Sequence, residues 1–270
     1  MSNIGDFEID NGKLRKYKGN EEHVVVPEGV TEISWGWQVF LNENLKSVKI
    51  PDTITTLNPR SFPQEGRTLA DENGFCIVGK FLLKYIGHAD TVTVPEGIAV
   101  LAPRAFANSV TLKKLILPAS IEVIGNQALT GCTEMKEVVF AENSSRFTTI
   151  DYGAFYNCNN LEKINIPQCV QFIHSNAFED CNKLFDDKDF LIISSILIKY
   201  KGSDKNVTVP DGIISIGREA FYQAQNIEKV ILPSGLKTIG EDAFSSIKTC
   251  LLYTSPSPRD AGASRMPSSA

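Results

Sequence analysis

The chain has 270 residues, of which 42% are hydrophobic and 22% charged, so it is long and apolar enough to bury a core. Its formal net charge of −5 argues against duplex nucleic acid as a partner, because such binding needs a concentrated basic surface. No apolar run approaches the ~20 residues that span a bilayer. The start, Met1 to Asp6, also lacks the basic and apolar stretches of a secretory signal. We therefore expect no nucleic-acid partner, no membrane span and a cytoplasmic location, with the cell surface or secretion as the alternative.

The first predicted element is a β-hairpin, and its pattern occurs three times. The hairpin cassettes cover about residues 7–26, 75–94 and 190–209. In each, a Phe is followed by Tyr at +10, Gly at +12 and Pro at +20, as in Phe7, Tyr17, Gly19 and Pro27. Asn11-Gly12 predicts a type I′ turn in the first cassette, and the other two follow by register. The hairpins either cover an end or edge of the core or project as recognition elements.

Between the cassettes the sequence repeats with a period of 23 residues. The pairs that show this spacing include Pro95 and Pro118, Pro210 and Pro233, Phe106 and Leu129, Phe155 and Phe178, and Phe221 and Phe244. One unit has about seven apolar positions, worth roughly 14 kcal/mol when buried. Ordering its backbone costs more than that, at ~1 to 2 kcal/mol per residue. Because one unit cannot fold alone, we expect stacked units that form a repeat solenoid.

Each repeat predicts a strand, a turn and a buried ring. Apolar residues alternate before the proline, and proline has no N–H with which to extend the strand. Strands of successive repeats are expected to pair in parallel. The Ile-Gly pair that follows predicts a turn, in which Gly125, Gly217 and Gly240 adopt positive φ. The next pair, Ala-Phe, places its ring in the core.

The string Ile-x-x-Ile-Gly-x-x-Ala-Phe-x-x-Cys-x-x-Leu-x-x-Val/Ile-x-Ile-Pro resembles the BspA-type leucine-rich repeat family. Residues 152–167 are a close copy, and the resemblance covers nearly all of residues 1–249. It implies a right-handed leucine-rich-repeat coil with a parallel strand ladder on its concave face, used for binding. The family is known for microbial surface proteins that contact host or matrix proteins. Many members, including intracellular ones, have no assigned role.

Cysteines and histidines are the candidates for chemistry. Cys132, Cys158 and Cys181 each follow the Phe or Leu of the repeat by three residues, where other units have Ser109 and Ala224. Substitution by Ser and Ala favours a packed column of small side chains over a metal or redox site. The three histidines are His23, His88 and His174, and their positions form no catalytic set. We expect no catalytic, cofactor-binding or metal site, no cofactor, and no enzyme.

The candidate binding face is a row of residues on the strands. In each strand the residue between two core positions points to the concave face, because side chains alternate. The row is Val25, Lys49, Thr93, Ile116, Val139, Asn165, Thr208 and Ile231. Four of these eight are aliphatic, which suits a protein or peptide ligand, although exposed aliphatic residues are also common on strands.

The sequence thus favours a non-enzymatic protein–protein interaction module that binds a protein or peptide on this face. The alternative is a targeting or adhesion segment of a longer surface protein or enzyme whose C-terminal part is missing. The two hypotheses agree on how the repeats fold and differ only in the segment C-terminal to them.

Residues 250–270 depart from the repeat. Cys250 to Asp260 resemble the translation of a transposon-type sequencing adapter, and Ser264 to Ala270 match the far end of that adapter. The alternative is an ordinary Ser/Pro-rich tail. We expect a solenoid over residues 1–249, truncated at its C-terminal end, and a non-native disordered tail over 250–270. An uncapped last repeat predicts self-association through the C-terminal end.

Overall fold

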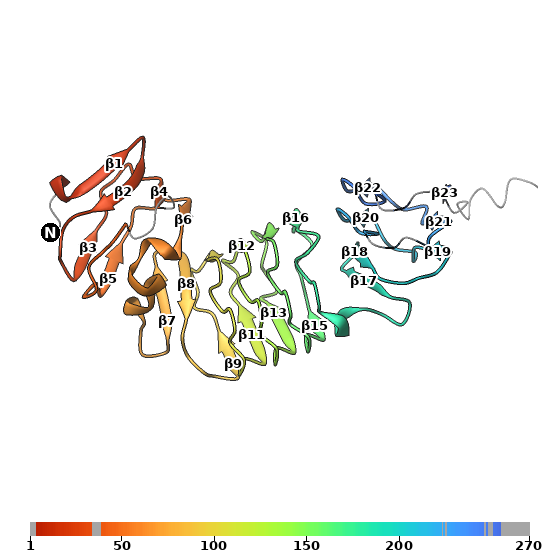
Figure 1. The fold of residues 1–270 in the computed structure, drawn as a ribbon, viewed down its shortest axis with the longest axis horizontal. Coiled ribbons are helices and arrows are strands. Elements are labelled where there is room, and N and C mark those ends of the chain that lie inside the picture. The colour runs from red at the N-terminus through yellow and green to blue at the C-terminus, as the bar shows by residue number, and fades with distance from the viewer. Residues whose placement is uncertain are drawn as a thin grey trace, which may run out of the picture. The chain divides into compact units, whose positions relative to one another are not determined.

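The computed structural model describes residues 4–33, 39–222, 224, 226–245 and 247 in full, and the backbone of residues 251–254. Residues Met1–Lys183 form one compact unit and residues Leu184–Ala270 a second. Both units consist mainly of short strands (Figure 1). The 3-10 helices in the described residues are η1 (Ile4–Asp6), η2 (Pro59–Ser61), η3 (Pro63–Leu69) and η4 (Asn182–Leu184).

Three antiparallel hairpins lie within the predicted cassettes. They are β1 (Phe7–Asp10) with β2 (Lys13–Tyr17), β7 (Phe75–Val78) with β8 (Phe81–Tyr85), and β17 (Phe190–Ile193) with β18 (Ile196–Tyr200). A two-residue turn closes each hairpin, as between the paired residues Val78 and Phe81. Asn11 and Gly12 both have positive φ, as a type I′ turn requires.

In each unit the strands at the repeat-proline end of the alternating segment form parallel sheets, which we call the first ladder of that unit. They pair in parallel, so that Lys114 lies opposite Glu137 and Leu115 opposite Val138. The first unit contributes β3 (His23–Val25), β5 (Ser47–Lys49), β9 (Thr91–Thr93), β11 (Lys114–Leu117), β13 (Glu137–Phe140) and β15 (Lys163–Ile164). The second unit contributes β19 (Asn206–Thr208), β21 (Lys229–Leu232) and β23 (Leu251–Thr254).

A second ladder of two-residue strands continues each hairpin. In the first unit its strands are β4 (Glu32–Ile33), β6 (Thr56–Leu57), β10 (Val100–Leu101), β12 (Val123–Ile124), β14 (Thr149–Ile150) and β16 (Phe172–Ile173). In the second unit they are β20 (Ser215–Ile216) and β22 (Thr238–Ile239). The orders are β1-β2-β4-β6, β7-β8-β10-β12-β14-β16 and β17-β18-β20-β22. Parallel ladders on successive coils confirm the predicted repeat solenoid.

Within each unit, aromatic rings stack from coil to coil through the core, and we call these stacks together the aromatic file. Its members are Phe7, Tyr17, Phe40 and Phe62; Phe75, Tyr85 and Phe106; Phe155 and Phe178; and Phe190, Tyr200, Phe221 and Phe244. Neighbouring ring centroids within these groups lie 4.8 to 5.7 Å apart. The Phe and Tyr of each cassette are therefore members of the core.

Backbone hydrogen bonds join successive coils beside the stacked rings. The N–H of Phe106 donates to the carbonyl of Ala128 at 2.7 Å, and the N–H of Phe155 to that of Ala177 at 2.8 Å. Ala128 and Ala177 are both fully buried. The Ala of each Ala-Phe pair is small because the backbone of the neighbouring coil packs against it.

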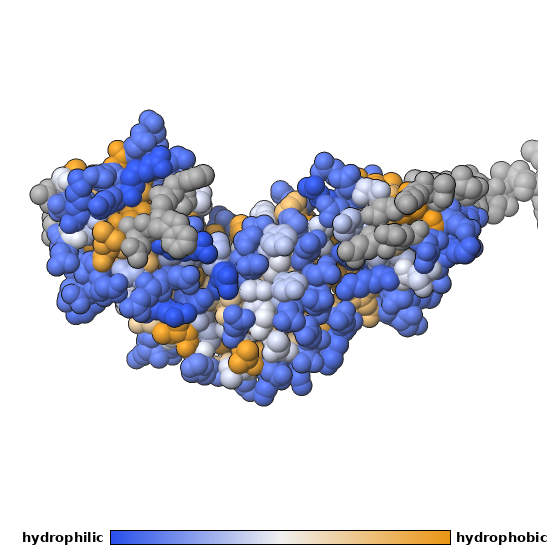
Figure 2. Space-filling model, in the orientation of Figure 1, coloured by the Kyte–Doolittle hydropathy of each residue, from blue (hydrophilic) through white to orange (hydrophobic). Residues whose placement is uncertain are grey.

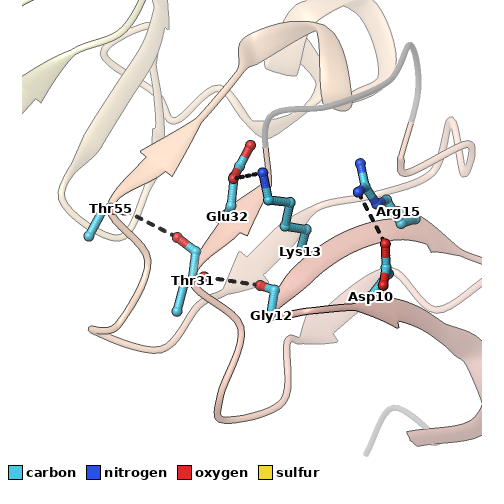
Figure 3. Close-up of polar contacts among 7 residues, drawn as sticks. All are labelled: Asp10, Gly12, Lys13, Arg15, Thr31, Glu32 and Thr55. Atoms are coloured by element: carbon cyan, nitrogen blue, oxygen red, sulfur yellow. Dashed lines mark hydrogen bonds and ion pairs between the residues drawn. The ribbon is translucent and has the colours of Figure 1, made fainter.

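The first hairpin is bonded to the coil that follows it (Figure 3). The N–H of Thr31 donates to the carbonyl of Gly12 at 2.8 Å, and the N–H of Thr55 donates to the carbonyl of Thr31 at 3.0 Å. Lys13 and Glu32, which pair between β2 and β4, form an ion pair of 2.8 Å. These bonds favour the covering role for this hairpin over a projecting one.

The glycines of the Ile-Gly pair are needed for a different reason from the predicted one. Gly125, Gly217 and Gly240 do not have positive φ, so that expectation was wrong. A Cβ on Gly125 would lie 2.7 Å from the carbonyl oxygen of Leu101, and one on Gly240 would lie 2.5 Å from the backbone nitrogen of Arg218. These glycines therefore allow the backbone of the preceding coil to approach closely. The sequence of one repeat does not reveal the distance between two coils.

The chain after Thr249 differs from the expected tail. Leu251–Thr254 form β23 and pair in parallel with β21, while residues 255–270 lie outside the described residues. Leu and Tyr, followed by the β-branched Thr, favour a strand, and the open edge of β21 offers unpaired backbone groups.

The glycine at +12 of each cassette predicts a packing defect when it is replaced. A Cβ on Gly87 would lie 2.4 Å from the Tyr85 hydroxyl, and Gly19 and Gly202 face Tyr17 and Tyr200 in the same way. We expect Gly87→Ala to lower the free energy of unfolding by about 1 to 3 kcal/mol because it overpacks the site. Urea unfolding measures this. Gly235→Ala is the control, because no atom lies within 4 Å of its added Cβ; equal stability of the two variants would contradict the packing argument.

Candidate functional site

Seven of the eight predicted face residues lie in strands of the first ladder, in three groups. The groups are Val25 with Lys49, Thr93 with Ile116 and Val139, and Thr208 with Ile231, and the members of each are cross-strand partners. Along each strand, the residue next to the face residue is buried, as the alternation predicts. The row is interrupted because the hairpins β7–β8 and β17–β18 lie between the groups in sequence and join the second ladder.

The centre of the middle group is an aliphatic pair beside an ion pair. Ile116 and Val139 lie directly opposite each other and are half-buried. Two residues earlier on the same strands, Lys114 and Glu137 form an ion pair of 2.7 Å. We call these four residues the ladder patch. An apolar centre with a charged margin is the arrangement found in protein interfaces.

Asn165 differs from the other predicted face residues. It follows β15, and its side-chain amide is bonded to the backbone of Phe140. The N–H of Phe140 donates to Asn165 Oδ1 at 2.8 Å, and Asn165 Nδ2 donates to the carbonyl of Phe140 at 3.1 Å. The Asn165 amide thus takes the place of a backbone partner for Phe140 at the end of the strand pair. These two hydrogen bonds fix its side chain on the neighbouring coil.

Several lysines near the first ladder are paired with acidic residues of neighbouring coils. Lys46 lies 2.6 Å from Glu22, and Lys205 lies 2.6 Å from Glu228. The hydrogen bond from Lys46, together with its charge, lowers the pKa of Glu22. The corresponding bond to Glu228 raises the pKa of Lys205. These pairs partly neutralise the lysines next to the strands.

The three repeat cysteines form a buried column of free thiols. The thiols of Cys132, Cys158 and Cys181 donate to the carbonyls of Phe106, Leu129 and Phe155 at 3.1 to 3.2 Å. Hydrogen bonds with the thiols of Cys132 and Cys181, followed by burial, raise the pKa of Cys158. A raised pKa suppresses the reactive thiolate, so the column is suited to packing.

The histidines have separate surroundings. His23 Nδ1 lies 2.8 Å from the Ser47 hydroxyl, whereas the His174 ring contacts Tyr152 edge-on with centroids 5.0 Å apart. In the part of the chain that the structure describes, no group of three or more His, Cys, Asp or Glu residues could hold a metal ion.

Sequence reasoning missed a hollow that lies outside the first ladder. It has a volume of 270 Å³ and is lined by Gln127, Tyr152, Gly153, Tyr156, Asn176 and Glu179. The signal in the sequence is Gly153, which stands where the other copies of the repeat have Arg104, Gln127, Asn176, Glu219 and Asp242. Figure 2 shows a mostly hydrophilic surface with separate hydrophobic patches.

The repeat is matched by a known sequence family. The description "BspA type Leucine rich repeat region" fits residues 9–67, 72–185 and 192–258, with six copies. The chain belongs to the BspA-type leucine-rich repeat family. The resemblance seen in the sequence is thereby confirmed, and these leucine-rich repeats are the coils described above.

Several solved leucine-rich repeat structures are similar to this BspA-type chain at low identity. The T. pallidum leucine-rich repeat protein TpLRR is 20% identical, with a TM-score of 0.39, over 64% of this chain and 77% of that one. A leucine-rich cell surface protein of Faecalibacterium prausnitzii is 19% identical, with a TM-score of 0.37, over 94% and 74%. The pneumococcal vaccine antigen PcpA is 20% identical, with a TM-score of 0.39, over 91% and 66%.

Two further findings are negative. No curated protein sequence matched this BspA-type chain. Within the described ranges, none of the helices has the length and apolar character that crossing a membrane requires.

The buried thiols predict a labelling order. At pH 8.5 in native buffer, iodoacetamide should label the partly buried Cys169 and leave Cys132, Cys158 and Cys181 unmodified, because all three thiols are buried and the pKa of Cys158 is also raised. In urea all four should react, which peptide mass spectrometry measures. Labelling of native Cys158 as fast as in urea would contradict the packed column.

Proposed function

We propose that this BspA-type repeat chain is a non-enzymatic interaction module that binds a protein or peptide on the strand face of the first ladder. The proposal rests on the ladder patch. Ile116 and Val139 present adjacent aliphatic side chains on a rigid backbone, and the Lys114–Glu137 ion pair borders them. Rigid strands lose little conformational entropy when a partner binds, which favours affinity.

The patch has the features of a small interface centre. Its aliphatic side chains are half-buried rather than fully exposed, so a partner needs to displace only the remaining solvent. The lysine and the carboxylate beside them contribute orientation and partner choice more than affinity. Of the other predicted residues, Val25 is 50% exposed and adds apolar surface, whereas Asn165 contributes less because Phe140 holds its amide.

The alternative proposal is a targeting or adhesion segment of a longer surface protein or enzyme. Both proposals share the repeat as the binding element and differ in the segment C-terminal to it. The reading frame in the source DNA beyond the codon for Thr249 tests this alternative, since a stop codon soon after one further repeat would exclude it.

We propose a cell-surface or secreted location in place of the cytoplasmic one expected from the start of the chain. Its support is the membership of a family known for microbial surface proteins. Protease treatment of intact source cells tests the proposal, because only an exterior protein releases its peptides.

The ladder patch yields a direct prediction. We expect Ile116→Glu combined with Val139→Lys to reduce capture of the partner at least tenfold, because charges replace the apolar centre. Opposite charges are chosen because the two residues face each other and like charges would repel. Stability should change by less than about 1 kcal/mol, the span of strand propensities.

The experiment is a pull-down on the immobilised full chain, with retained proteins quantified by mass spectrometry. Val110→Glu serves as the control, because Val110 is 55% exposed and lies outside both ladders. A protein retained by the wild type and the control but lost from the double variant supports the proposal. If the double variant retains the same proteins, the binding site lies elsewhere.

We also propose self-association through the last coil of the second unit. Ile239 is 48% exposed although the equivalent Ile216 is 1% exposed, and Phe244 is half-buried although Phe221 is fully buried. Size-exclusion chromatography should show a dimer or larger species that Ile239→Glu converts to monomer. A monomer at high concentration of the wild-type chain would contradict this.

A further inference from the structure

One column of side chains on the coils is interrupted. The position before each Ala-Phe pair, or before Ala128-Leu129, is occupied by Arg104, Gln127, Gly153 and Asn176 in the first unit and by Glu219 and Asp242 in the second. Gly153 has a φ of 58°, and Arg104, Gln127, Glu219 and Asp242 have φ between 52° and 62°. Because residues with side chains adopt this conformation elsewhere in the column, the backbone does not explain Gly153.

The missing side chain leaves the hollow of 270 Å³. Gln127 reaches it from the preceding coil, and Asn176 and Glu179 reach it from the following coil. Tyr152 and Tyr156 form its rim and are 43% and 44% exposed. The hollow is therefore bounded by side chains of three successive coils.

The rim is held in place by contacts that do not involve a ligand. The Tyr152 and His174 rings form a T-shaped contact with an interplanar angle of 89°, and the N–H of Asn176 donates to His174 Nδ1 at 3.2 Å. The carbonyls of Tyr152 and Tyr156 accept the N–H groups of Gln127 and Gly131, both at 2.8 Å. A fixed rim reduces the entropy cost of binding.

The lining combines two tyrosines with side-chain amides that lack some of their possible hydrogen-bond partners within the described ranges. Among the described residues, the side-chain amide of Gln127 has no hydrogen-bond partner. Asn176 Oδ1 accepts from Ser175 at 3.1 Å, and Asn176 Nδ2 is without a partner in the same part of the chain. Amides both donate and accept, whereas the Glu179 carboxylate only accepts. A matching ligand must present an apolar face and several groups that donate as well as accept.

We propose that this hollow binds one pyranose ring of a neutral saccharide. The C–H face of the ring packs on the tyrosines, and its hydroxyls donate to Glu179 and exchange hydrogen bonds with Gln127 and Asn176. A proline-rich peptide fits less well, because prolines offer carbonyl acceptors and no N–H for the amide oxygen of Gln127. An anionic ligand is disfavoured because no lysine or arginine lines the hollow.

The test is saturation-transfer NMR on the full chain. The probes are methyl β-D-glucopyranoside, methyl β-D-galactopyranoside and methyl α-D-mannopyranoside, with tetraproline as the peptide probe. We expect at least one pyranoside to receive saturation, with a Kd on the order of 1 mM, and tetraproline to receive none.

Three variants locate the binding. Gly153→Gln fills the hollow at a φ that Gln127 already adopts. Its Cβ would lie 3.3 Å from Cγ of the Gln127 side chain, which can shift, so the variant should fold and lose the pyranoside signal. Tyr156→Ala should weaken binding about tenfold by removing one aromatic face. Tyr222→Ala is the matched control: Tyr222 follows Phe221 as Tyr156 follows Phe155 and is 45% exposed, but Arg218 and Glu219 replace the neighbouring Tyr152 and Gly153. It should bind as the wild type does.

Each remaining outcome overturns the proposal. Absence of saturation in all three pyranosides would do so, as would equal binding by the wild type and Tyr156→Ala. Transfer to tetraproline that Tyr156→Ala removes would assign the hollow to a peptide. If Gly153→Gln has a lowered Tm, its loss of signal could come from unfolding, and the Tyr156→Ala result then decides whether the hollow is the binding site. These readouts do not involve the ladder patch, so they are independent of the proposed protein binding.

Discussion

Every coil depends on its neighbours to bury its apolar side chains. The contact between coils is tightest at the Ala-Phe pairs, where rings stack and the backbones are hydrogen-bonded. Phe155 and Phe178 stack with an interplanar angle of 2° and centroids 5.0 Å apart. At the same place, the N–H of Phe155 donates to the carbonyl of Ala177. The small residues of the repeat follow from this contact, since larger side chains would separate the coils.

The sequence was sufficient to predict what recurs within one repeat. The spacing of the aromatic residues identified the file, and alternation before the prolines identified the first ladder. It could not predict distances between coils, so Gly125 was assigned a conformational role although the carbonyl of Leu101 is the real constraint. It also placed Asn165 on the binding row, because a side chain that bonds to the backbone of another coil leaves no local pattern.

The two proposed binding sites use positions that the scaffold leaves free. Nearly all of the file, the alanines and the repeat thiols are buried, and backbone hydrogen bonds also join the coils. Surface columns can therefore change without loss of the stack. The ladder patch arises where two strands carry Ile116 and Val139, and the hollow arises where one column position lacks a side chain at Gly153.

The measurement that tests the account most directly is the stability of Phe178→Ala. Phe178 is 3% exposed and stacks on Phe155, so its removal should lower the free energy of unfolding by about 3 to 5 kcal/mol in guanidinium titration. The control is Phe172→Ala, because Phe172 lies in the same coil and is 44% exposed, and its loss should cost much less. A cost below about 1 kcal/mol for Phe178→Ala would contradict a stack held together by its aromatic file.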